Sequence, residues 1–182
     1  MNPLALIEKY YPPGAESHRI LLRHSTRVAE KAVAVARRLK DYRPVDVSFV
    51  EEAALLHDIG ILHTSVPRIG CLGDHPYICH GILGREILER EGLPRHALVC
   101  ERHIGVGLTV EDIREQGLPL PMREMAPRTV EEEIVAYADL FFSKKPSAGD
   151  RERTVAEVRG SLSRFGEYKV AIFDAWHQRF SD

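Results

Sequence analysis

Apolar residues recur at helical spacing in the longest patterned segment of this sequence, and that spacing constrains the fold more than any other feature. Between residues 17 and 40 the apolar positions are separated by three, four or seven residues: Leu21, Val28, Ala32, Val35 and Leu39. Such positions lie on one face of an α-helix, so a long helix with a core-facing side is expected. Strand signals are nearly absent. We therefore predict an all-α helical bundle.

Start and stop signals divide the rest of the chain into shorter helices. Two capping boxes, Ser48–Glu51 and Thr129–Glu132, mark helix starts because their side chains can satisfy free backbone N–H groups. Asp74 is expected to cap another helix, with Pro76 in its first turn. The expected helices cover about residues 3–11, 17–40, 48–57, 74–91, 94–103, 129–142, 151–164 and 168–180. Residues 60–74, 117–127 and 146–149 are expected to be irregular loops or linkers.

Composition limits the class of protein. The 182 residues, 44% hydrophobic and 29% charged, suit a single globular domain over 1–182. A net charge of −2 without a basic block argues against a nucleic-acid polymer as partner. The sequence has no run of roughly 18 apolar residues, which argues against a membrane span. Three cysteines without CxxC spacing indicate reduced thiols, so a cytoplasmic protein is expected.

The residues that can carry chemistry centre on His57 and Asp58, which follow the apolar run 53–56. Buried polar groups cost a few kcal/mol unless they are paired or bind a metal. Further residues of this kind lie on or at the end of other expected helices: His24, His80, His103 and Asp139. Metal sites in bundles use such inward side chains, and imidazoles with carboxylates suit transition ions. From the residues alone, a metal site and a set of ordinary core histidines and helix caps both remain open.

The ordered residues resemble the HD-domain metal-dependent phosphohydrolases, and most closely a small HDIG-type branch of that superfamily. The motifs are Arg23-His24-Ser25-Thr26-Arg27-Val28, His57-Asp58-Ile59-Gly60 and Tyr137-Ala138-Asp139. The resemblance covers about residues 18–145, the expected HD core, and implies a helical bundle with the metal site between core helices. A short helix at 3–11 would precede this core, and a helical extension over about 150–181 would follow it.

The resemblance also implies divalent metal ions and the residues that hold them. His24, His57, Asp58 and Asp139 would hold one ion, and His80 and His103 would hold a second, with Asp58 bridging. Iron, manganese, zinc, cobalt, nickel and magnesium are not distinguished, and the number stays open between one and two. Such ions polarise a phosphoryl oxygen and activate water, so Asp58 is also expected to be catalytic. The implied substrate is a phosphate ester or anhydride of a nucleotide or similar small molecule.

Substrate phosphates also need cationic partners. Arg27 lies three residues after His24, on the same helix face, and is the first candidate for a phosphate contact and a catalytic role. Lys144 is a second candidate for both roles, and Arg102 is a further candidate for substrate binding. The plain alternative is that an arginine on a helix extends to water.

His80 is the preferred sixth ligand, but the sequence offers competitors. His63 and His75 flank the loop 60–74 and could take its place. We favour His80 because it is expected more than one turn inside its helix, where Gly81 and Gly84 would allow close approach to the metals. His75 is then expected to contact substrate or to support the site from its edge.

The sequence departs at two positions from the cyclic-dinucleotide hydrolases, and two other functions remain open beside a phosphohydrolase. Ile61 follows Gly60 where cyclic-dinucleotide hydrolases carry lysine, and no Gly-Tyr-Pro signature follows His103, so cyclic di-GMP hydrolysis is not expected. A mixed-valent di-iron oxygenase of the HD type would use the same six ligands. A non-catalytic metal-binding sensor is the third possibility. The C-terminal helices can pack on the core or on a second subunit, which leaves a homodimer open.

Overall fold

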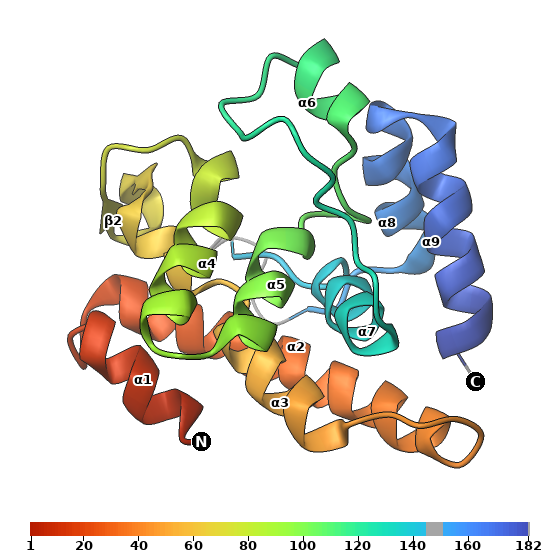
Figure 1. Cartoon of the computed structure of the whole chain (residues 1–182), viewed down its shortest axis with the longest axis horizontal. Coiled ribbons are helices and arrows are strands. Elements are labelled where there is room, and N and C mark those ends of the chain that lie inside the picture. The colour runs from red at the N-terminus through yellow and green to blue at the C-terminus, as the bar shows by residue number, and fades with distance from the viewer. Residues whose placement is uncertain (145–150, 182) are drawn as a thin grey trace.

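Helix α2 (Glu16–Lys40) is the longest element among the residues that the structure describes, 1–144 and 151–181 of a computed structural model. It runs across the lower part of Figure 1, with α3 (Val47–Leu56) and α7 (Val130–Asp139) packed against it. A second pair, α4 (His80–Arg90) and α5 (Pro94–Arg102), packs side by side and contacts the turn that follows α3. The predicted all-α fold is confirmed.

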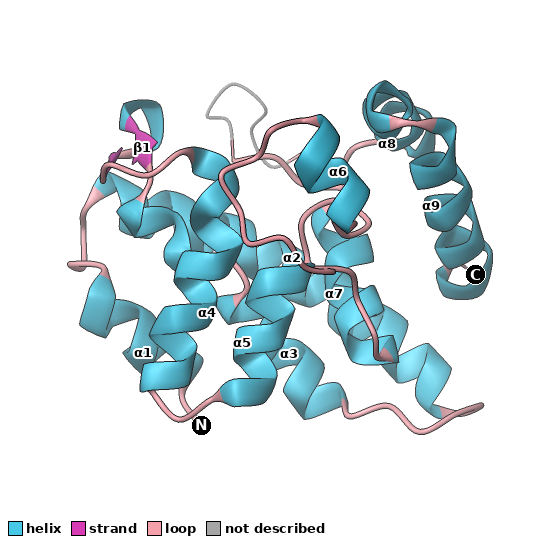
Figure 2. Cartoon of the chain, turned by 45° about the horizontal axis from the view of Figure 1, so that its top comes forward, coloured by secondary structure: helices cyan, strands magenta, loops and turns pink. Residues whose placement is uncertain are grey.

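Shorter elements complete the described chain (Figure 2). They are α1 (Pro3–Tyr10), α6 (Val110–Glu115), α8 (Val155–Leu162) and α9 (Glu167–Phe180), with 3-10 turns at Ile59–His63, Pro67–Ile69, Tyr77–Cys79 and Ser163–Phe165. A small antiparallel hairpin joins β1 (Ser65–Val66) to β2 (Cys71–Leu72). Val66 pairs with Cys71 and Ser65 with Leu72. The segment 60–74 is therefore a folded turn-and-hairpin unit rather than a plain loop.

The helices bury two main apolar clusters. The larger joins α2, α3 and α7 to the two C-terminal helices, and the other joins α1, α4, α5 and the start of α2. The C-terminal helices contribute six buried side chains to the larger cluster: Val158, Leu162, Val170, Phe173, Trp176 and Phe180. Packing on the core is therefore the arrangement found for these helices, and the homodimer remains a prediction.

The start of α3 differs from the predicted one. Asp46 caps this helix, and its carboxylate accepts a hydrogen bond from the Phe49 N–H at 3.0 Å. The predicted capping box at Ser48 is wrong because Asp46, an equally good cap two residues earlier, places Ser48 inside the first turn. Thr129 caps α7 as predicted, accepting from the Glu132 N–H.

The start of α4 also differs, and the difference moves a candidate ligand. The backbone of His75 bonds to two residues of the hairpin unit, accepting from the Ser65 N–H at 2.8 Å and donating to the His63 carbonyl at 3.2 Å. The chain is therefore extended where Asp74 was expected to cap a helix, and a 3-10 turn at Tyr77–Cys79 precedes α4. His80 is the first residue of this helix, not one that lies more than a turn inside it.

The C-terminal extension folds as two helices: α8 is shorter than the predicted 151–164, whereas α9 matches the predicted 168–180 to within one residue. The linker expected at 146–149 lies outside the described residues. Within residues 1–144 and 151–181, no helix combines the length and the apolar character that crossing a bilayer requires.

Candidate metal centre

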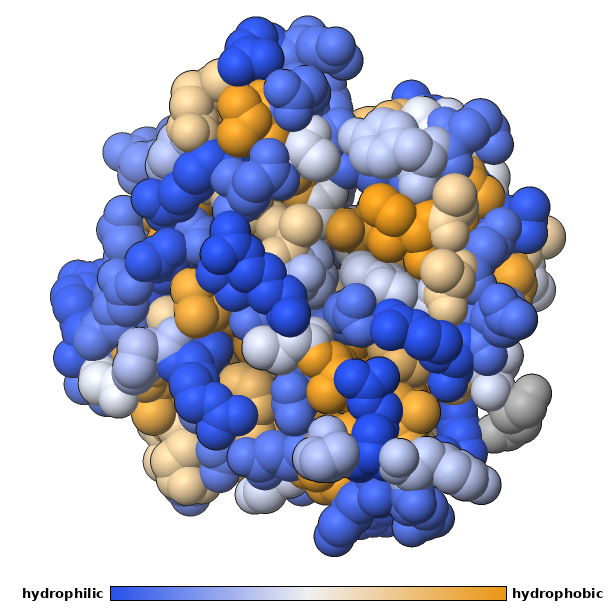
Figure 3. All heavy atoms as spheres, turned by 45° about the vertical axis from the view of Figure 1, so that its right-hand side comes forward, coloured by the Kyte–Doolittle hydropathy of each residue, from blue (hydrophilic) through white to orange (hydrophobic). Residues whose placement is uncertain are grey.

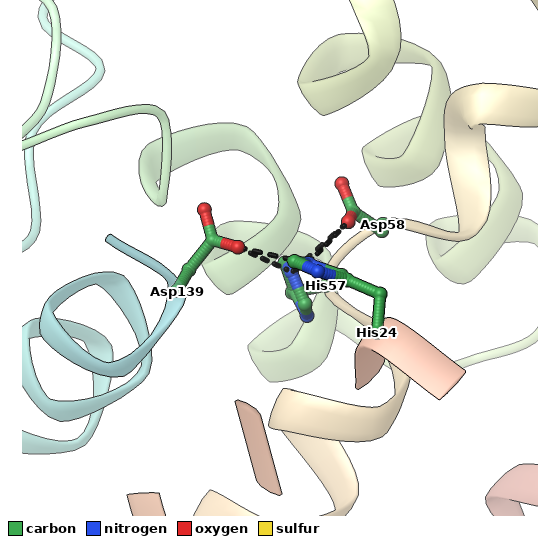
Figure 4. A group of neighbouring side chains, drawn as sticks. All are labelled: His24, His57, Asp58 and Asp139. Atoms are coloured by element: carbon green, nitrogen blue, oxygen red, sulfur yellow. Dashed lines mark hydrogen bonds and ion pairs between the residues drawn. The ribbon is translucent and has the colours of Figure 1, made fainter. Parts of the chain in front are cut away.

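Four side chains from three helical segments converge inside the molecule (Figure 4). His24 lies on the buried face of α2, His57 and Asp58 directly follow α3, and Asp139 is the last residue of α7. The first three are buried, and 17% of the Asp139 side chain is exposed. The packing of α3 and α7 against α2 brings these side chains together.

The ligand atoms of these four residues, the first ligand group, are separated as expected around one ion. His24 Nε2 lies 3.1 Å from Asp58 Oδ2 and 2.9 Å from Asp139 Oδ1. His57 Nε2 lies 3.1 Å and 3.4 Å from the same two oxygens, and 3.3 Å from His24 Nε2. Two ligands at right angles, each about 2.1 Å from an ion, are about 3.0 Å apart. The group therefore has the dimensions of a metal site.

Asp58 belongs to a second ligand group, with His80 and His103. Its other oxygen, Oδ1, lies 3.5 Å from the Nε2 atoms of both histidines, and those two atoms are 3.1 Å apart. His80 begins α4 and His103 directly follows α5, so the pairing of these helices makes this group. The two oxygens of one carboxylate thus face the two groups separately, which is the arrangement of a bridging ligand.

Three of the histidines use Nδ1 as a donor to the backbone, so their other ring nitrogen carries the lone pair whenever the ring is neutral. The Nδ1 atoms of His57, His80 and His103 donate to the carbonyls three residues earlier, at 2.7, 2.6 and 2.8 Å. The Nε2 atom of each neutral ring therefore carries a lone pair. In the second group two such lone pairs face each other and a carboxylate oxygen, an arrangement that repels unless a cation lies between them. A backbone acceptor on the far ring nitrogen is also typical of metal-binding histidine.

The carboxylate oxygens of the two groups are buried with few donors around them. Asp58 Oδ1 accepts no hydrogen bond, and the Lys144 ammonium is the one resident cation on Asp58 Oδ2 among the described residues, although a buried carboxylate normally accepts several hydrogen bonds. Metal ions would satisfy these oxygens and the facing nitrogens together. The residues present therefore fit the implied ions.

The glycine of the His57-Asp58-Ile59-Gly60 motif sets the distance between the two groups. A Cβ atom on Gly60 would lie 2.1 Å from the His80 carbonyl oxygen and 2.3 Å from the Gly84 nitrogen. Only a glycine allows the backbone after Asp58 to touch the first turn of α4. This contact brings His80 to Asp58, a role that the sequence did not suggest.

The electrostatics of the first group show how its charges are balanced without an ion. The Lys144 ammonium lies 2.5 Å from Asp58 Oδ2 and 3.9 Å from Asp139 Oδ1. Burial opposes a charge on His57, but the carboxylates of Asp58 and Asp139 outweigh it and raise the pKa of His57 to about 10. In the second group burial dominates and lowers the pKa of His80 to about 3. Without an ion, the first group therefore holds the positive charges of Lys144 and His57, whereas His80 of the second group is neutral.

The other predicted site residues lie at different distances from the two groups. Arg27 is 41% exposed, pairs with Glu30 at 3.5 Å, and its guanidinium carbon lies 5.6 Å from the ring centre of Phe142. Arg102 turns away from the site, donating to both Glu132 oxygens at 3.0 and 3.1 Å. His75 is exposed, lies beside Asp74, and belongs to neither group.

A cavity of about 220 Å³ beside the first group, here called the cationic cavity, contains residues that the sequence did not suggest. Its walls include Arg68, Tyr77, Phe142 and Lys144. The Tyr77 ring stacks on His80, with centroids 4.6 Å apart, and burial raises the pKa of its phenol to about 12. Arg68 lies in the turn-and-hairpin unit, where no periodic pattern marks a residue as functional. Its position only becomes apparent once the hairpin is folded.

Comparison with known proteins identifies the family to which the site belongs. The family model for the HD domain matches residues 21–142. A tRNA (cytidine(56)-2'-O)-methyltransferase from Thermoplasma volcanium is 36% identical over 164 residues, 90% of this chain and 40% of that protein. A protein of the same name from Picrophilus torridus is 37% identical over 125 residues, 68% of this chain and 32% of the relative. The chain thus spans less than half of either methyltransferase.

A third relative and two solved structures agree with this assignment. An uncharacterized protein from Methanocaldococcus jannaschii is 41% identical over 129 residues, 69% of this chain and 68% of the relative. The HD domain of L. monocytogenes phosphodiesterase PgpH has the same fold, with a TM-score of 0.56, 18% identity, and coverage of 97% of this chain and 87% of that one. A structure of that domain with cyclic-di-AMP is equally similar, over 100% and 89%. The chain is therefore a member of the HD-domain family.

Proposed function

We propose that this protein is a metal-dependent phosphohydrolase that cleaves a phosphate ester or anhydride of a nucleotide or similar small molecule. One observation carries the proposal: two groups of metal-binding atoms share the buried carboxylate of Asp58, one oxygen in each group. His24, His57 and Asp139 would complete the site on one side, and His80 and His103 on the other. When bound, divalent ions polarise a phosphoryl oxygen and lower the pKa of water toward neutrality.

The residues around the groups support phosphate as the reacting part of the substrate. Lys144 and Arg68 line the cationic cavity next to the first group, and Arg27 lies beside Phe142 in its wall. Ammonium and guanidinium groups bind phosphate oxygens by charge-assisted hydrogen bonds. We propose that Lys144 moves from Asp58 to the substrate phosphate when the site is loaded, and that Arg68 orients that phosphate from the hairpin.

The fold likeness to PgpH, one structure of which holds cyclic-di-AMP, supports nucleotides as the first substrates to test. The naming of two relatives as tRNA methyltransferases adds short RNA to that panel. In this role the protein would act on a phosphorylated small molecule rather than on a polymer. RNA therefore serves as a comparison that can overturn this part of the proposal.

The test is a panel of mononucleotides, a cyclic dinucleotide, sugar phosphates and short RNA, incubated without oxygen with the metal-loaded protein. Hydrolysis of at least one small phosphorylated compound is expected, measured as released phosphate for monoesters and by chromatography of the products for diesters and anhydrides, and it should be lost in Asp58→Asn but kept in Asp41→Asn. Asp41 is an exposed carboxylate at the end of α2 and serves as the matched control. A parallel incubation in air is the comparison: binding of two ions without hydrolysis, but with substrate-dependent oxygen uptake in air, would overturn the proposal in favour of an oxygenase.

A further inference from the structure

A second cavity, of about 240 Å³, has almost entirely apolar walls. Its lining includes three residues next to or near candidate ligands in the chain: Ile78 before His80, Ile104 after His103 and Leu140 after Asp139. We call it the apolar cavity. Figure 3 shows apolar side chains gathered in a hollow on the face of the molecule that carries α8 and α9. A group bound at the second ligand group would therefore lie next to apolar surface.

The apolar and cationic cavities share two segments of chain in their walls. Tyr77 lines the cationic cavity and its neighbour Ile78 lines the apolar one. At the end of α7, Phe142 lines the first and Leu140 the second. The candidate metal ligands His80 and Asp139 belong to or adjoin these segments. A molecule bound at the metal groups can thus place a charged part in one cavity and an apolar part in the other.

The walls of the apolar cavity include an exposed aromatic ring and a hydrogen-bonding amide, which together can contact a planar base. Phe165 lines the cavity, and 57% of this residue is exposed to solvent. A large aromatic side chain left exposed in this way is often a contact point for a ligand. Gln116, an exposed amide with donors and an acceptor, lies at the same cavity. Lys169 contributes only its aliphatic stem, because its ammonium is bonded at 2.6 Å to both the Gly107 carbonyl and Asp112.

We propose that the apolar cavity binds a planar aromatic group of the substrate, such as a nucleobase, while its phosphate lies at the ligand groups and the cationic cavity. This inference rests on the proposed function and names the substrate class more narrowly. A space of about 240 Å³ is smaller than the roughly 300–1,000 Å³ of sites for drug-sized ligands, so it suits one ring system. The substrate is then an aromatic phosphate with a single base rather than a dinucleotide.

The test is calorimetric binding of four non-hydrolysable phosphonates to the metal-loaded protein: methyl-, phenyl-, 1-naphthyl- and octylphosphonate. Affinity should rise at least about tenfold from methyl to naphthyl, because burying apolar surface is favourable. Naphthylphosphonate should also bind more tightly than octylphosphonate. Equal affinity for methyl and naphthyl, or a clear preference for octyl, would overturn the proposal. If none of the four binds, methylphosphonate included, the phosphate site and hence the proposed function have failed.

Variants of the cavity make the test specific. Leu118→Trp fills the cavity from a half-buried position, and Phe165→Ala removes the exposed ring. Each should reduce the preference for naphthyl over methyl at least about fivefold while leaving methylphosphonate binding unchanged. Met122→Trp is the control, because Met122 is 55% exposed in the same irregular segment and does not line the cavity. A naphthyl preference that survives both cavity variants would place the aromatic group elsewhere and overturn the proposal.

Discussion

The two ligand groups share Asp58 but are built in different ways. The first stands on α2, α3 and α7, helices that pack through the larger apolar cluster, and it faces the charge of Lys144. The second depends on one close backbone contact, Gly60 against the first turn of α4, and contains a single carboxylate with two imidazoles, of which burial keeps His80 neutral. The first group therefore has more negative charge and a more robust scaffold. We expect it to bind its ion more tightly than the second group.

The largest effect should come from removing the residue that the two groups share. Asp58→Asn takes a charge from both groups, so both ions should be lost and turnover should fall at least about a thousandfold. Metal content and phosphate release measured on the same preparation check this, with Asp41→Asn as control. A variant that keeps one ion at full occupancy would show that Asp58 serves only one group.

The next largest effect, a loss of stability, should come from disturbing the close contact of Gly60 with α4, which positions the second group alone. Gly60→Ala places a Cβ atom 2.1 Å from the His80 carbonyl oxygen, so α4 must shift. The free energy of unfolding should fall by about 3 kcal/mol, at the upper end of overpacking costs. Urea denaturation measures it.

The matched control for this change is Gly160→Ala. Gly160 lies in α8, and a Cβ atom there would meet nothing within 4 Å. This variant should be as stable as the wild type or more stable by up to about 1 kcal/mol. If Gly60→Ala were equally well tolerated, the close approach of the two segments would not be what positions His80.

The next largest difference should be in the number of protons that each ligand group releases when it binds its metal ion. His57 has a pKa of about 10 without an ion, so it is protonated at pH 7–8 and must lose that proton when it binds a metal. His80, with a pKa of about 3, has no proton to lose. The affinity of the first group should therefore rise about tenfold per pH unit between pH 7 and 9, while that of the second stays nearly level. Calorimetry in buffers of different ionisation enthalpy counts the protons, and release of none from the first group would contradict this account.

The smallest effect should come from the ammonium that competes with the first ion. Lys144→Met removes a charge 2.5 Å from Asp58, so metal affinity should rise severalfold, while KM should rise about tenfold because a phosphate partner is lost. Lys40→Met, at the exposed end of α2, is the control and should change neither value. A fall in metal affinity would mean that Lys144 supports the ion rather than replaces it.

The difference between the two ligand groups also explains which parts of the structure could be predicted from the sequence. Helix α2 and the position of His24 follow from apolar spacing, because a long amphipathic helix has one way to bury its face. The start of α4 did not follow, because His75 is held in a backbone pairing with the hairpin unit that no local pattern reveals. Arg102 was predicted to bind substrate because it precedes His103 in the chain. In the structure its guanidinium is paired with the carboxylate of Glu132, which is 30 residues away in the sequence.

Residues of the cationic cavity were missed for a related reason. Arg68 lies in a 3-10 turn of the hairpin unit, and Tyr77 in the turn before α4, so neither belongs to a periodic segment. Their roles come from how these turns fold back on the metal groups. Sequence patterns identify residues on long helices because local spacing determines their direction, and they miss residues that only a tertiary contact directs.

The central claim, two metal sites that share Asp58, is tested most directly by the number of ions bound. Elemental analysis of the wild type, reconstituted with excess metal and then freed of unbound ions, should give two ions per chain. His103→Gln, which removes a ligand from the second group alone, should keep the fold and bind one. One ion per chain in the wild type, unchanged in His103→Gln, would contradict the account.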